Sequence, residues 1–136
     1  MDVKHQVPPP PDVVTERVRS APVELRDRIY RLRALVYDVG AKADAWPLIE
    51  EIKWGQPSYR SPHGNESTPV RIGWTDDGDV ALLTHCQSTV IPEFRSAFGD
   101  RYRFDGNRAV LLGPKDELHD DDLAELIHHA LTYRRR

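Results

Sequence analysis

The chain has 136 residues, of which 39% are hydrophobic and 30% charged, and its formal net charge is −3. This size and composition are typical of a single soluble globular domain. No apolar run approaches the roughly 20 residues of a membrane-spanning helix, and the nearly balanced charge gives no general attraction for nucleic acid. The single cysteine, Cys86, excludes an internal disulfide. Together with the lack of a signal-peptide core, it predicts a cytoplasmic protein.

The first forty residues predict a tail followed by two helices. Residues 1–11 end in four consecutive prolines, which favour an extended polyproline conformation, so we predict a flexible or loosely docked tail. Asp12 is suited to cap a short helix over residues 12–19. Over residues 23–39 apolar positions recur with the helical period of 3.6, and Gly40 is a natural stop. A single domain is predicted to span residues 12–136.

The rest of the chain switches between helical and strand patterns. Taken in order, the predicted elements are a short helical segment over residues 45–50, a β-hairpin from 70–74 and 80–85, a helix over 88–98, a second hairpin from 101–104 and 108–112, and a C-terminal helix whose apolar face carries Leu123, Leu126, Ile127, Ala130 and Leu131. This order predicts an α+β fold, with an antiparallel sheet of about five strands packed with N-terminal and C-terminal helices.

Five short segments of the chain resemble the signature of the YdhG-like family, a bacterial domain family of unknown function. The segments are residues 50–59, 71–74, 86–89, 102–109 and 130–133, so the resemblance spans about residues 22–133. It implies a small α+β fold with a curved antiparallel sheet, and it does not imply an enzyme. Some members of this broad family look like frataxin-like iron chaperones, which donate iron for cluster and haem assembly.

A candidate binding surface lies on the predicted sheet. Its expected members are Lys53, Trp54, Gln56, Tyr59, Arg71 and Arg103. Arg71 and Arg103 each alternate with apolar neighbours, so each faces away from the core side of its strand. If those faces coincide, they form a groove of arginine and aromatic side chains, which suits a small anionic ligand or an acidic protein. The alternatives are that these arginines pair with nearby carboxylates, and that Trp54 packs in the core.

The start of the C-terminal helix is crowded with carboxylate and imidazole side chains. Possible ligands for ferrous iron are Asp120, Asp121, Asp122, Glu125 and His129. Helical spacing puts Glu125 and His129 on one side of the helix. The competing explanation is that acidic residues stabilise a helix N-terminus, by about 0.3–1 kcal/mol each. A frataxin-like iron chaperone that binds Fe(II) there is therefore the alternative function, with iron as its cargo.

His85 and Cys86 stand at the end of a predicted strand, just before a helix N-terminus, where a thiol can become a nucleophile. Adjacent residues of a strand point to opposite faces, so His85 cannot readily serve Cys86 as a base, and a buried, inert cysteine is favoured. No phosphate loop, serine elbow or dinucleotide fingerprint occurs in the sequence. We therefore predict a binding module without catalytic activity or cofactor, as a monomer or weak homodimer.

Overall fold

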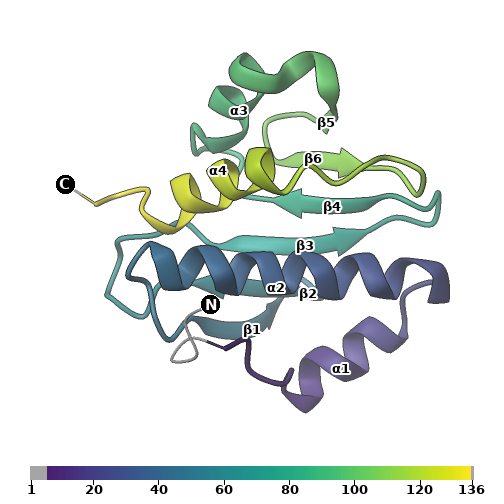
Figure 1. Cartoon of the computed structure of the whole chain (residues 1–136), viewed down its shortest axis with the longest axis horizontal. Helices are drawn as coiled ribbons and strands as arrows, with labels where there is room; N and C mark the ends of the chain where they lie inside the picture. Colours follow the sequence, from purple (N-terminus) through teal and green to yellow (C-terminus); the bar gives the residue numbers. More distant parts are fainter. Residues whose placement is uncertain (1–5, 136) are drawn as a thin grey trace.

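The computed structural model describes residues 6–135 and contains one curved antiparallel sheet, in the order β1-β2-β3-β4-β6-β5 (Figure 1). Its strands are β1 (Ile49–Lys53), β2 (Gln56–Arg60), β3 (Val70–Trp74), β4 (Val80–Leu83), β5 (Arg103–Asp105) and β6 (Ala109–Leu112). The predicted α+β fold is confirmed, with six strands where about five were expected. Residues 1–5 of the predicted tail lie outside the described part.

The β1–β2 hairpin begins inside the segment where we predicted a short helix over residues 45–50, and residues 45–48 before it form neither helix nor strand. That prediction was wrong because the helical preference of the two glutamates of β1 is outweighed by strand pairing with β2, which runs from Ile49 opposite Arg60 to Lys53 opposite Gln56. The two residues between the strands, Trp54 and Gly55, both have positive φ, 56° and 73°. Such a pair forms the turn that fits a two-residue hairpin.

The helices cover one face of the sheet, and α2 and α4 cross it side by side (Figure 1). They are α1 (Asp12–Arg19), α2 (Arg26–Lys42), α3 (Val90–Phe98) and α4 (Asp120–Leu131), with short 3-10 turns η2 (Val23–Leu25) and η3 (Gly99–Arg101). Helix α2 continues past its predicted stop at Gly40, where a Cβ would lie 3.0 Å from Leu48 Cδ1. Gly40 therefore serves close packing rather than helix termination. No helix in the described residues is long and apolar enough to cross a membrane.

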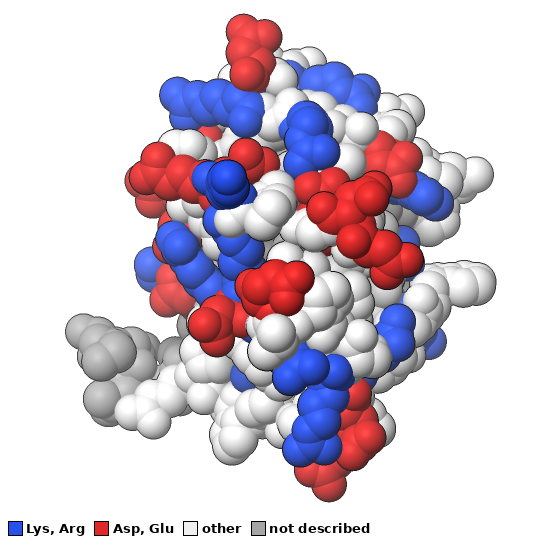
Figure 2. All heavy atoms as spheres, turned by 90° about the vertical axis from the view of Figure 1, so that its right-hand side faces the viewer, with Lys and Arg blue, Asp and Glu red and all other residues white. Residues whose placement is uncertain are grey.

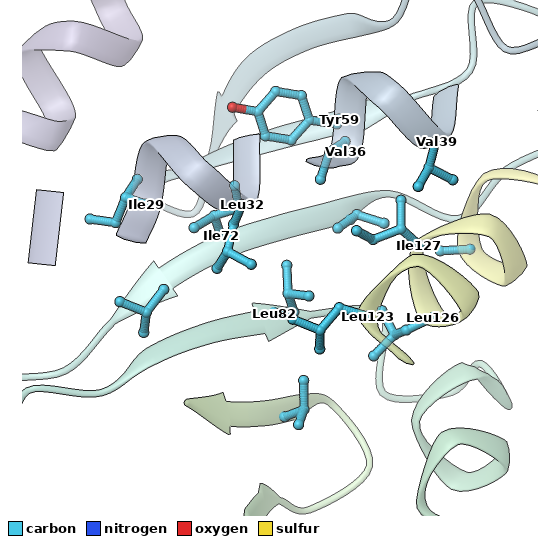
Figure 3. Close-up of a cluster of buried hydrophobic side chains, with 14 of the residues drawn as sticks. Ile29, Leu32, Val36, Val39, Tyr59, Ile72, Leu82, Leu123, Leu126 and Ile127 are labelled. Carbon is cyan, nitrogen blue, oxygen red and sulfur yellow. The ribbon is translucent and has the colours of Figure 1, made fainter. Parts of the chain in front are cut away.

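The hydrophobic core lies between the sheet and the helices (Figure 3). Its fully buried members include Ile29, Leu32 and Val36 of α2, Ile72 and Leu82 of the central strands, and Leu123, Leu126 and Ile127 of α4. These residues occupy the inward positions of their elements, as the 3.6-residue and two-residue periods require. The helices therefore bury only one face of the sheet, and the other face is not covered by them.

A buried ion pair joins α2 to β1 inside this core. Arg33 donates from Nε to Glu50 Oε2 at 2.7 Å and from Nη2 to Oε1 at 2.9 Å, and the two side chains are only 4% and 6% exposed. The Tyr37 hydroxyl donates to the same carboxylate at 2.9 Å, whereas the buried Tyr59 hydroxyl lies near it without a well-aligned hydrogen bond. Burial alone would raise the pKa of Glu50, but the hydrogen bonds and the charge of Arg33 outweigh it and lower that pKa. Arg33 Nη1 also donates to the Pro8 carbonyl at 2.7 Å.

Charged side chains of both signs are interspersed over the end of the molecule that carries the β3–β4 turn (Figure 2). Exposed ion pairs of this protein include Arg31 with Asp120 at 3.1 Å and, at the opposite end of the sheet, Arg108 with Asp105 at 2.9 Å. Exposed pairs of this kind each contribute little stability. This end therefore presents no extended surface of one sign that would attract a polyanion.

Candidate functional site

No helix of the described residues covers the other face of the sheet, to which we refer as the open face. The strand register arranges its side chains in rows, with Ser58 opposite Arg71 and Arg71 opposite Leu83. In the next row Gly73 lies opposite Ala81. Small and apolar side chains thus occupy the centre of this open face, and Arg71 brings a charge to the border between its centre and the β1–β2 hairpin.

A hollow of about 270 Å³ opens on this face beside the β1–β2 hairpin. We refer to this cavity and the residues that line it as the hollow. The lining residues are Glu51, Lys53, Trp54, Ser58, Arg60, Pro69, Arg71 and His85. The one carboxylate, Glu51, is paired with Lys53 at 3.3 Å. Within residues 6–135, no carboxylate lies at ion-pair distance from Arg60 or Arg71. The hollow therefore carries an excess of positive charge.

Arg71 is the most constrained cation of the hollow. Its side chain is half-buried, and Nη1 donates to Gln56 Oε1 at 2.9 Å. Burial and then the positive charge of Arg108 lower the pKa of the Arg71 guanidinium, which still remains protonated at neutral pH. A bound anion would offset both of these unfavourable effects. This arginine is therefore the group of the hollow that gains most from an anionic partner.

The Gln56 side chain lies over Gly73, which leaves space for it because glycine has no side chain. A Cβ at Gly73 would lie only 2.7 Å from Gln56 Nε2 and 3.0 Å from Leu83 Cδ1. The glycine thus leaves the room in which the Gln56 amide accepts the hydrogen bond from Arg71. Gln56 is a positioning residue for Arg71.

Replacing Gly73 with alanine should move the Gln56 amide while preserving the fold, because the atoms in the way are the ends of flexible side chains. We expect new NMR positions for the Gln56 side-chain amide and for Arg71 Nε–H, with a loss of stability of about 1–3 kcal/mol. Gly99→Ala is the control, since its Cβ would meet only Arg95 Cγ at 3.4 Å. Unchanged Gln56 signals in Gly73→Ala would contradict this role.

Trp54 stands at the tip of the hairpin and is 87% exposed, so the alternative that it packs in the core was wrong. The turn is tied to the helix layer by Arg17 of α1, whose Nε donates to the Gly55 carbonyl and whose guanidinium lies 5.2 Å from the Trp74 ring centroid. Arg17 thus fixes the turn from the covered side of the sheet, while Trp54 lines the hollow on the open side.

His85 and Cys86 follow β4, and only His85 lines the hollow. Cys86 is exposed, so the interpretation of a buried cysteine was wrong; the chain has already left the strand at this point and turns toward α3. His85 Nδ1 accepts a hydrogen bond from the Gln87 backbone N–H at 3.1 Å. The neutral ring then carries its proton on Nε2, where it is a hydrogen-bond donor.

Two residues expected at the binding surface lie elsewhere. Tyr59 is fully buried on the helix side, because β2 places it between the outward-facing Ser58 and Arg60. Arg103 does face the open side, but β4 and β6 separate it from Arg71, and it pairs with Asp79 at 2.6 Å. Lys53, Trp54 and Arg71 are brought together in the hollow, with Gln56 beside them.

Sequence reasoning missed five members of the hollow: Glu51, Ser58, Arg60, Pro69 and His85. The available signal was the two-residue period that runs from Gln56 through Ser58 to Arg60. It is recognisable only if residues 56–60 are read as a strand, and the proline at position 57 argues against that reading.

The acidic residues of α4 have separate partners. Asp120 pairs with Arg31 at 3.1 Å, and Asp122 accepts from Arg101 Nη1 and from the Tyr102 hydroxyl, both at 2.9 Å. His129 lies 3.6 Å from Glu93, while Asp121 and Glu125 are exposed. Within residues 6–135 no three His, Cys, Asp or Glu side chains are grouped as a metal site would require. The structure does not bring the expected iron ligands together, because the turns of α4 direct them toward different neighbours.

Comparison with known proteins found a similarity of fold. No family model matches the chain, and no curated protein matches it. A crystal structure of YdhG from Bacillus subtilis, a protein of the DUF1801 family, aligns with a TM-score of 0.62 at 16% identity, covering 87% of each chain. At this identity the likeness concerns the fold alone. It confirms the resemblance drawn from the sequence at that level: the chain has a YdhG-like α+β fold.

Proposed function

We propose that this protein is a non-enzymatic module that binds a small anionic ligand in the hollow, with Arg71 as its principal contact. The observation that carries the proposal is the half-buried guanidinium of Arg71, which has a glutamine but no carboxylate as its partner within residues 6–135. Even partial burial of an arginine without a counter-charge is unfavourable. A carboxylate or phosphate group relieves that cost and can accept two parallel hydrogen bonds from the guanidinium.

The other members of the hollow support the same class of ligand. Arg60 and Lys53 add positive charge, and His85 offers a donor from Nε2. Ser58 lies directly opposite Arg71 and also lines the hollow, where its hydroxyl can donate to a ligand oxygen. Cations and hydroxyl donors that converge on one hollow are suited to holding an anion rather than to transforming it.

The exposed thiol of Cys86 supports a cytoplasmic location, since a reducing compartment keeps such a group free.

The test is titration with inorganic phosphate and with acetate, followed through backbone and side-chain NMR signals. We expect saturable shifts that are confined to the residues of the hollow. Arg71→Ala should weaken phosphate binding about 10- to 100-fold, because hydrogen bonds to charged groups contribute about 1.5–3 kcal/mol. Arg71→Lys keeps the charge without the planar fork and should give an intermediate loss.

The matched control is Arg103→Ala, which removes the same charge from the same sheet face but lies outside the hollow. Its phosphate affinity should equal that of the unmodified protein. Equal losses in Arg71→Ala and Arg103→Ala would reduce the effect to general electrostatics and overturn the proposal. Uniform shifts over the whole surface would do the same.

A further inference from the structure

Trp54 occupies a backbone position that is unfavourable for its residue type. Its φ of 56° lies in the left-handed region, where Asn, Asp and Gly are preferred and bulky side chains are rare. Its indole gains little burial in return, since 87% of the side chain is exposed. A bulky residue at such a backbone position, without turn propensity or core packing to favour it, points to a contact outside the chain.

The indole and the cations belong to one hollow. Trp54 and Arg71 both line it, together with Lys53 and Arg60. Arg17 anchors the adjacent Gly55 carbonyl from the covered side of the sheet, so the turn is held in place while the indole remains free. An aromatic ring on a fixed turn is a stacking surface that loses little conformational entropy when it binds. A flat ring is its natural counterpart.

We propose that the ligand of the hollow is an aromatic anion, in which a flat ring stacks on Trp54 and an attached phosphate or carboxylate binds Arg71. This inference rests on the proposed anion-binding function and adds the ring to it. Two sources share this chemistry, a nucleotide and an aromatic carboxylic acid. Both join a planar aromatic ring to an anionic group, as the hollow joins Trp54 to Arg71.

Matched pairs of probes test the contribution of the ring. Adenosine monophosphate is compared with ribose phosphate, and indole acetate with acetate, in NMR titrations of the full chain. Stacking of a base on an aromatic side chain predicts an affinity about 5- to 100-fold higher for the ring-bearing member of at least one pair. The pair that shows the gain identifies the source. Trp54→Ala should abolish this gain, so that the ring-bearing and the ring-free member of each pair bind with equal affinity.

The control variant is Val23→Ala, which shortens another exposed apolar side chain, at 70% exposure, outside the hollow. It should retain the full gain from the ring. Equal affinities within both probe pairs, or a gain that persists in Trp54→Ala, would overturn the aromatic-anion inference while leaving anion binding intact. If neither phosphate nor acetate binds, and Arg71→Ala behaves as the unmodified protein, both the inference and the proposed function are overturned.

Discussion

Glu50→Ala should lower the free energy of unfolding by about 3–5 kcal/mol, the largest effect that we expect from a single substitution in this protein. The reason is the environment of Arg33, which is 4% exposed and would remain charged inside the core without its bidentate partner. Tyr37 would lose the acceptor of its hydroxyl at the same time. Chemical denaturation followed by circular dichroism measures the loss.

The double variant Arg33→Met, Glu50→Leu is the control for this interpretation. Replacing both charges with apolar side chains of similar volume is often neutral or stabilising, so the double variant should be much more stable than Glu50→Ala. If the double variant is as unstable as Glu50→Ala, packing rather than the unpaired charge explains the loss.

The same pair should make stability depend on pH. Because the folded-state pKa of Glu50 is lowered, its contribution is fully present above the unfolded-state value near 4.5 and is lost as the pH falls through the folded-state pKa. The unmodified protein should therefore lose stability between about pH 4.5 and more acidic conditions more steeply than the double variant. Parallel pH profiles of the two proteins would contradict the assignment.

Leu82→Ala should cost about 2–5 kcal/mol, whereas Leu83→Ala should cost less than about 2 kcal/mol. The two leucines are neighbours on β4 with 0% and 8% exposure. Leu82 points into the core beneath the helices (Figure 3). Leu83 packs in a separate cluster on the open face. Truncation of Leu82 leaves a closed cavity, while water can reach the space left by Leu83. Urea denaturation of both variants provides the measurement.

Equal costs for these two leucines would contradict the one-sided arrangement. They would mean that a further layer covers the open face in solution, and sedimentation analysis of the unmodified protein would then identify a second copy of the chain as that layer. Val80→Ala supplies a second comparison on the core side of the same strand, where its side chain is 0% exposed.

Sequence patterns predicted the elements whose side chains have one clear periodicity. The apolar stripe of α2 and the alternation of β3 are regular because each element buries one face, and the structure confirms both. The β1–β2 hairpin was not predicted because its two strands bury polar groups, above all Glu50, whose burial depends on Arg33 in a distant helix. Secondary-structure propensity does not reflect an interaction partner that only the tertiary fold brings close.

The candidate site was predictable where it depends on strand alternation and not where it depends on strand order. Alternation correctly directs Arg71 away from the core. It gives the same direction for Arg103, and only the order of the strands shows that β4 and β6 lie between them. Tyr59 was misplaced for a related reason: its face follows from the register of β2, which the sequence pattern did not reveal.

The alternation of β1 has a consequence for how the protein tolerates insertions and deletions. Neighbouring glutamates in this strand serve opposite sides, Glu50 the buried ion pair and Glu51 the hollow. A gain or loss of one residue in the strand would exchange the two sides and would turn Glu50 away from Arg33 toward the hollow. Viable homologues should therefore vary the length of this hairpin in steps of two residues, or confine odd changes to its turn.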